Sequence, residues 1–167
     1  MTISIGIALT LSGCGNKPDG HRDFATPSTL CGVEFDTSEL VKFLPSGKNL
    51  STKEEHPGKG ITQCRVLIDD KLAASATQAW QAEGSTLTEF SAGQTLKKID
   101  HAADGGKYVF SGSEAFGSAD NCTNPEQANR RLFTAVQATD SKHDDSDAMK
   151  SLIESYTSAV EHSNACR

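Results

Sequence analysis

The apolar residues near the C-terminus of the chain recur with the period of an α-helix. They fall at i, i+3, i+4, i+7, i+10 and i+11 and form one stripe: Met149, Leu152, Ile153, Tyr156, Ala159 and Val160. Aspartates at positions 144, 145 and 147 lie where the positive end of a helix dipole favours acidic side chains. The pattern predicts an amphipathic helix from Ser146 to Glu161.

A shorter helix is predicted near the start of the folded region. Leu40, Phe43 and Leu44 share one helical face at i, i+3 and i+4 spacing. The Asp-Thr pair at positions 36 and 37 can cap this helix, and Pro45 ends it. The next residues, 46–60, are polar and rich in Lys, Glu and Gly, and they predict a surface loop.

From residue 61 the apolar period changes to two, which is typical of a strand. Thr62, Cys64, Val66 and Ile68 alternate with polar neighbours, so they share one face. The next two residues are aspartates and predict a tight turn into a second segment, Leu72–Trp80. That segment is rich in alanine, and helix propensity alone would favour a helix. The adjacent turn and the strands that follow favour a strand, which we predict here.

Further strands are predicted in the second half of the chain. The four segments are Leu96–Asp100, Lys107–Gly112, Glu114–Ser118 and Arg131–Thr139. We find no internal repeat, and the only long hydrophobic run is the one at the N-terminus. No transmembrane helix is therefore predicted. The elements together predict an α+β fold, in which an antiparallel β-sheet packs against a short N-terminal and a longer C-terminal helix. Residues 31–167 are expected to form this single domain.

The first fourteen residues predict where the protein resides. The apolar run from Ile3 to Leu9 is too short to span a hydrocarbon core, which takes about 20 residues, and it fits a signal peptide. It leads into Leu11-Ser12-Gly13-Cys14, which matches the bacterial lipobox, whose cysteine is lipidated and becomes the N-terminus. We therefore expect a lipoprotein signal peptide over residues 1–13, lipidation of Cys14, and a flexible lipidated tether over residues 14–30.

This signal places the protein on the outer face of the cell membrane, held by acyl chains. No Lys or Arg precedes the apolar run, although secretory signals carry a positive first region. We therefore expect the true start codon to lie upstream of Met1.

Four cysteines remain once Cys14 is lipidated. An even number of cysteines in an exported protein predicts two disulfides among Cys31, Cys64, Cys122 and Cys166. Three connectivities are open, and we favour Cys31–Cys64 with Cys122–Cys166 because each closes a moderate loop. A four-cysteine zinc site is the alternative, but the chain has no Cys-x₂-Cys pair.

The composition changes this picture little. The formal net charge is −6, aromatic residues make up 6%, and Trp80 is the only tryptophan. Without a basic cluster, nucleic acid is not an expected partner. An acidic exterior also disfavours direct binding to anionic lipid headgroups.

A search for chemistry finds no catalytic residue, cofactor motif or metal site. No histidine lies within helical reach of another, and no Gly-x-Ser-x-Gly elbow occurs. Adjacent carboxylates at positions 54–55 and 69–70 are predicted in loops and do not form a glycosidase pair. The acidic segment Asp140–Asp147 lacks EF-hand spacing and is interpreted as a loop with a helix cap.

Several segments together resemble the small secreted lipoproteins of actinobacteria. They are Leu30-Cys31-Gly32, Cys64-Arg65-Val66, Cys122-Thr123-Asn124-Pro125, Leu132-Phe133-Thr134-Ala135-Val136, and the terminal stretch from Met149 to Cys166. The resemblance implies location and architecture more than activity. Related cell-wall lipoproteins are similar to the Mog1/PsbP-like arrangement, an antiparallel sheet flanked by terminal helices.

Two functions are expected from these observations. The first is a non-catalytic binding or accessory module of the cell envelope, with a membrane partner through the lipid on Cys14 and an envelope protein as a further partner. The alternative is a carrier of an apolar small molecule or lipid. Its cavity would lie between the sheet and the C-terminal helix, beside small and aromatic side chains: Ala73, Ala74, Ala76, Ala79, Trp80, Phe90, Tyr108 and Phe110.

Overall fold

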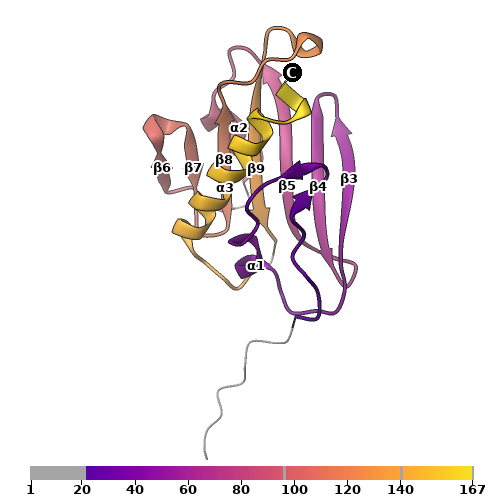
Figure 1. The fold of residues 1–167 in the computed structure, drawn as a ribbon. Helices are drawn as coiled ribbons and strands as arrows, with labels where there is room; N and C mark the ends of the chain where they lie inside the picture. Colours follow the sequence, from indigo (N-terminus) through magenta and orange to yellow (C-terminus); the bar gives the residue numbers. More distant parts are fainter. Residues whose placement is uncertain (1–21, 96, 140, 167) are drawn as a thin grey trace, which may run out of the picture.

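The structure is a computed structural model that describes residues 22–95, 97–139 and 141–166. Its centre is a seven-stranded sheet in which every neighbouring pair is antiparallel. In spatial order the strands are β3 (Leu50–Gly58), β4 (Ile61–Ile68), β5 (Lys71–Ala82), β9 (Arg130–Ala138), β8 (Glu114–Ala119), β7 (Tyr108–Phe110) and β6 (His101–Ala103). The predicted α+β class with an antiparallel sheet is confirmed (Figure 1).

The remaining elements cover the two faces of this sheet. They are the two-stranded ribbon of β1 (Thr29–Leu30) and β2 (Val33–Glu34), and the helices α1 (Leu40–Phe43), α2 (Leu87–Ala92) and α3 (Ser146–Glu161). Short 3₁₀ turns occupy Asp104–Gly106, Pro125–Gln127 and Asn164–Cys166. Among the described residues, no helix is long and apolar enough to cross a membrane.

Helix α3 lies across β7, β8 and β9 (Figure 1). Its apolar stripe is buried there except for Ala159, which is partly buried. Gly117 permits the close approach, because a β-carbon at this position would lie 2.4 Å from Oγ1 of Thr157. The hydroxyls of Thr157 and Thr134 are hydrogen-bonded at 2.6 Å, so the polar groups of this contact are satisfied. The bounds predicted for this helix, Ser146 to Glu161, are confirmed.

The N-terminal segment covers the other half of the same face. Leu30, Leu40 and Phe43 are at most 2% exposed and belong to the same apolar cluster as α3. Part of the predicted tether belongs to this cover, because the Arg22 side chain donates to the carbonyl of Leu44 at 2.8 Å. The packed domain therefore begins before the predicted boundary at residue 31.

Helix α2 lies on the opposite face and forms a second, smaller core, and the sequence analysis missed it. Phe90 stacks on Phe133 with ring centroids 5.3 Å apart, and it meets Phe116 edge-on. A capping box joins Thr86 and Glu89 at the start of the helix, each side chain accepting from the other residue's amide. The sheet is thus buried on both faces over β7–β9.

The strand predictions around residues 61–80 are confirmed. Cys64, Val66 and Ile68 are buried on the α3 face, and the alanine-rich segment is the strand β5. The two residues of the connecting turn, Asp69 and Asp70, have φ of 48° and 64°. Positive φ at both positions is the pattern of a type I′ hairpin turn.

Two sequence predictions are wrong. Residues 46–60 were expected to be a loop, but β3 runs through Leu50–Gly58 as an edge strand. Edge position explains its charged sequence, since charges and a proline hinder pairing with another chain. The predicted strand at residues 96–100 is also displaced: residues 97–100 are outside any strand, and β6 begins at His101.

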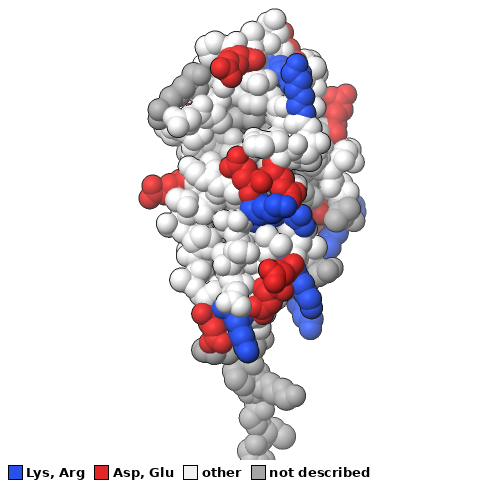
Figure 2. All heavy atoms as spheres, turned by 90° about the vertical axis from the view of Figure 1, so that its right-hand side faces the viewer, with Lys and Arg blue, Asp and Glu red and all other residues white. Residues whose placement is uncertain are grey.

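Acidic and basic side chains lie side by side on the β3 edge, and this face shows no large patch of one sign (Figure 2). Glu55 is bonded to Lys53 at 2.8 Å and to Arg65 at 3.1 Å. The bond from Lys53 and then that from Arg65 lower the pKa of Glu55. The adjacent carboxylates at positions 54 and 55 therefore lie on a strand rather than in the predicted loop.

Candidate functional site

The four cysteines form two disulfides, which fasten each end of the domain to the sheet. Cys31 is bonded to Cys64, and this bond ties the β1–β2 ribbon to β4. Cys122 is bonded to Cys166, and this bond ties the end of α3 to the loop between β8 and β9. The favoured connectivity matches these bonds, and thiols spent in disulfides are not zinc ligands. Cys14 lies outside the described residues.

The interface proposed to hold an apolar ligand is filled by protein side chains. Ala74 and Ala76 of β5 are 1% exposed, and they share one cluster with Met149, Leu152 and Tyr156 of α3. Both alanines are thus enclosed by protein side chains. The packing therefore favours a structural role for the alanines over a ligand cavity.

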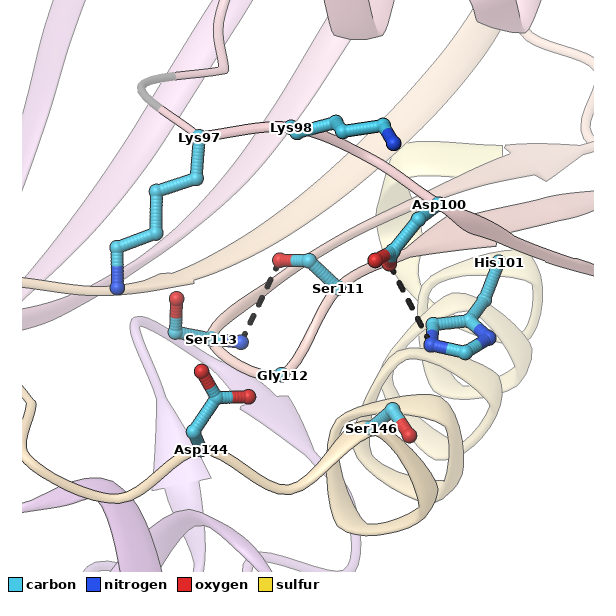
Figure 3. A pocket seen from close by; sticks show the side chains of 9 residues that line it. All are labelled: Lys97, Lys98, Asp100, His101, Ser111, Gly112, Ser113, Asp144 and Ser146. Atoms are coloured by element: carbon cyan, nitrogen blue, oxygen red, sulfur yellow. Dashed lines mark hydrogen bonds and ion pairs between the residues drawn. The ribbon is translucent and has the colours of Figure 1, made fainter.

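A polar pocket of about 240 Å³ lies at the end of the sheet where α3 begins (Figure 3). Three segments meet there: the approach to β6, the loop between β7 and β8, and the start of α3. The pocket is lined by Lys97, Lys98, Asp100, His101, Ser111, Gly112, Ser113, Asp144 and Ser146. The serines at 111 and 113 are buried, whereas the charged residues are exposed around them.

The loop between β7 and β8 forms the buried part of the pocket. Ser111 Oγ accepts hydrogen bonds from the amides of Ser113 and Glu114 at 3.4 and 3.2 Å. The amide of Ser111 donates to the carbonyl of Glu114 at 2.8 Å. These bonds close a short turn, and the Gly112 carbonyl accepts from the amide of Asp145 at 2.9 Å, which joins the turn to the start of α3.

Ser113 is the unusual residue of this loop. Its side chain is 1% exposed, and its Oγ has no hydrogen-bond partner among the described residues. Leaving a buried hydroxyl unpaired costs about 1–3 kcal/mol, and native structures contain few such groups. In Figure 3 this hydroxyl is directed into the space between the lysine at 97 and the turn. A buried donor at the pocket is therefore available for a ligand.

A buried carboxylate holds the segment that bears the two lysines. Glu114 is 3% exposed and accepts from Nε2 of Gln137 at 3.3 Å and from the hydroxyl of Thr95. The hydroxyl of Thr95 also accepts from the amide of Lys97 at 3.2 Å. This series of hydrogen bonds runs from Gln137 through Glu114 and Thr95 to the amide of Lys97. It fixes the position of the segment that bears the two lysines at the end of the sheet.

His101 is held at the rim of the pocket by two contacts. Its ring stacks on Phe110, with centroids 5.3 Å apart and an interplanar angle of 16°. Its Nε2 lies 3.4 Å from a carboxylate oxygen of Asp100. Within the described chain, no serine hydroxyl is hydrogen-bonded to this imidazole. The pocket therefore lacks the nucleophile–base contact on which a serine hydrolase depends.

The start of α3 completes the site. Asp145 caps the helix by accepting from the amide of Ala148 at 2.9 Å, and this bond is the first cause that lowers the pKa of Asp145. The predicted helix cap in the acidic segment is confirmed by this contact. In the part of the chain that the structure describes, no group of three or more His, Cys, Asp or Glu residues is arranged to hold a metal ion.

Sequence reasoning missed this pocket, because its residues come from three segments far apart in the chain. The histidine at 101 was noted only for lacking a helical partner, and the Ser111-Gly112-Ser113 turn was not recognised. No family model matches the chain, and no curated protein or solved structure shows significant similarity to it. The resemblance to actinobacterial lipoproteins therefore stays a prediction.

Proposed function

We propose that the protein is a lipid-anchored, extracytoplasmic binding module that holds a small polar molecule without transforming it. The observation that carries this proposal is the buried hydroxyl of Ser113, which has no partner within the described chain and faces a polar pocket. Functional sites are where proteins retain such unsatisfied groups.

The location rests on two features of the sequence and on the disulfides. The lipobox at residues 11–14 provides the anchor, and the apolar run before it directs export. The bonds Cys31–Cys64 and Cys122–Cys166 are consistent with an oxidising compartment outside the cytoplasm. A domain on the outer face of the cell membrane fits all three.

The start of the described chain and the pocket lie toward the same end of the sheet. The described chain starts at Arg22, which pairs with Gly47 beside the hairpin turn at Asp69. The pocket loop is also at this end, because the Ser113 carbonyl accepts from the amide at the end of β9. Cys14 lies eight positions before Arg22, and a chain of eight residue steps reaches at most about 28 Å. A lipid on Cys14 would keep the pocket end near the membrane.

The anchor is tested by cell fractionation. The full chain and its Cys14→Ser variant are expressed in a bacterium that processes lipoproteins, and membrane and soluble fractions are compared. We expect the parent in the membrane fraction, accessible to protease from outside the cell, and the variant released. A parent chain found reduced in the cytoplasm would overturn the proposed location.

The binding function is tested by amide NMR on the oxidised chain of residues 14–167 carrying Cys14→Ser. All sheet pairings and both disulfides described above lie within residues 22–166, so this chain contains the packed domain. A panel of neutral sugars, sugar acids, amino acids and phosphate is titrated in. We expect saturable shifts at Ser111, Gly112 and Ser113 with at least one class. No saturable shift with any class would overturn the binding function.

A further inference from the structure

The rim of the pocket carries unpaired charges of both signs. Within the described chain, neither Lys97 nor Lys98 has a carboxylate within ion-pair distance, and the carboxylate of Asp144 has no cationic partner. Asp100 is engaged with the imidazole of His101 instead. Two ammonium groups and one carboxylate are therefore available to a ligand that bears an acidic group together with hydrogen-bond donors.

The buried part of the pocket selects for hydroxyl groups. Ser111 and Ser113 line it, and none of the described lining residues has an aliphatic or large apolar side chain. These residues offer an apolar substituent no surface on which to be buried. The volume of about 240 Å³ is below the roughly 300 Å³ at which pockets for drug-sized molecules begin, so it suits a single sugar ring.

Given the proposed binding function, on which this inference rests, we infer that the pocket binds a sugar acid, a monosaccharide that carries one carboxylate. The carboxylate would lie against the ammonium group of Lys97, with that of Lys98 adding to the positive charge of the rim. The ring hydroxyls would accept from the hydroxyl of Ser113 and donate to the carboxylate of Asp144. In Figure 3 the ammonium group of Lys97 lies on the same side as Ser113 and Asp144, whereas the Lys98 side chain extends toward the side of Asp100.

Other ligand classes fit less well. A bare phosphate would satisfy the lysines, but at neutral pH its charge exceeds that of one carboxylate, so it would be repelled more strongly by Asp144. A neutral sugar would leave both ammonium groups without a counter-charge. An amino acid would match the charges, but most amino acid side chains would lack apolar contacts in this pocket.

The test compares glucuronate with glucose, glutamate and inorganic phosphate in amide NMR titrations of the chain described above. We expect glucuronate to bind at least tenfold more tightly than glucose, with the largest shifts at residues 97–98 and 111–113. Raising the salt concentration is expected to weaken glucuronate binding, because the lysines are exposed. Equal binding of glucose and glucuronate would overturn the inference.

A double variant separates the role of the lysines from that of the fold. Lys97→Met with Lys98→Met is expected to weaken glucuronate binding about tenfold or more. The matched control is Lys59→Met, an exposed lysine in the turn between β3 and β4, at the opposite end of the sheet. The control should bind like the parent. A double variant that binds glucuronate like the parent would also overturn the inference.

The outcomes distinguish this inference from the proposed function. If glucose or glutamate shifts the same amides and glucuronate binds no better, the binding module stands and the sugar-acid assignment is wrong. If no panel member shifts them, both are wrong.

A sugar acid could come from solution or from the headgroup of a membrane glycolipid. A pocket held near the membrane by a lipid on Cys14 would meet both. Sedimentation with vesicles containing glucuronosyl diacylglycerol tests the second source, with diglucosyl diacylglycerol vesicles as the control. Selective sedimentation that the Lys97/Lys98 double variant loses assigns the glycolipid headgroup. Binding of free glucuronate without sedimentation assigns the soluble acid.

Discussion

The carboxylate of Asp144 lies directly against the backbone of Gly112. A β-carbon at position 112 would lie 1.4 Å from Oδ1 of Asp144 and 3.1 Å from the amide nitrogen of Asp145. Only glycine leaves room for this approach, and the carbonyl of the same glycine accepts the amide of Asp145. The contact sets how closely the start of α3 approaches the β7–β8 turn, so it shapes the pocket.

Replacing Gly112 by alanine should therefore disturb both stability and binding. We expect Gly112→Ala to lower the free energy of unfolding by about 1–3 kcal/mol, the usual cost of overpacking. The pocket amides should shift even without ligand. Gly84→Ala is the control, because a β-carbon at position 84 meets no atom within 4 Å. Urea unfolding of both variants checks this, and equal stability of the two would contradict the steric role.

Replacing Ser113 should change the free energy of unfolding in the opposite direction. Because its buried hydroxyl has no partner among the described residues, Ser113→Ala removes an unsatisfied group. We expect the free energy of unfolding to rise by up to about 1 kcal/mol, while ligand binding becomes weaker. The control is Ser111→Ala, which removes an acceptor used by two amides and should destabilise the fold. A Ser113 variant that is as unstable as the Ser111 variant would contradict the assignment.

The two disulfides should differ in how readily they are reduced. Cys64 is 2% exposed, so that only Cys31 of this pair is partly exposed, whereas Cys122 and Cys166 are both partly exposed. Access to a reductant therefore favours attack on Cys122–Cys166. We expect mild reduction followed by alkylation and mass spectrometry to label Cys122 and Cys166 before Cys31 and Cys64. Simultaneous labelling of all four would contradict this order.

Loss of either bond should still be costly. In the chain-entropy description, closing loops with sequence separations of 33 and 44 contributes roughly 4 kcal/mol each. Replacing either cysteine pair by serine is expected to lower the free energy of unfolding by about 2–4 kcal/mol, measured by urea unfolding. A loss below about 1 kcal/mol would show that packing alone holds that end of the domain.

The sequence was informative wherever burial follows a period. Met149 to Val160 revealed α3, and the alternation at Cys64, Val66 and Ile68 revealed β4, because each element buries one face. Strand β3 escaped detection since an edge strand bears charges and gains its order from pairing with β4. Helix α2 could have been found, because Thr86 and Glu89 form the Thr-x-x-Glu signal of a capping box.

The pocket could not be predicted by the same reasoning. Lys97 and Ser113 line the same pocket because β6 pairs with β7, which in turn pairs with β8. Asp144 joins them from the segment that leads into α3. No periodicity in the sequence predicts that these three segments come together. The unsatisfied hydroxyl of Ser113 depends on the absence of neighbours, which only three-dimensional packing determines.

The alkaline stability of the domain should depend on Tyr156. Burial raises the pKa of Tyr156 to about 12, and the hydrogen bond that Nε2 of Gln78 donates to its hydroxyl at 3.4 Å opposes this shift only partly. The unfolded state releases this proton near pH 10, before the folded state does. Stability from this residue is therefore complete below about pH 10 and is lost as the pH rises toward 12.

We expect the free energy of unfolding to fall by about 2–3 kcal/mol across that window, and Tyr156→Phe to remove most of the fall. At neutral pH the variant should cost less than about 1 kcal/mol, because it gives up one long hydrogen bond. A residual dependence should persist, since burial also raises the pKa of Tyr108. Urea unfolding from pH 7 to pH 11.5 checks this, with Tyr108→Phe as the comparison. If the Tyr156 variant loses stability as steeply as the parent, the buried phenol is not the group that titrates.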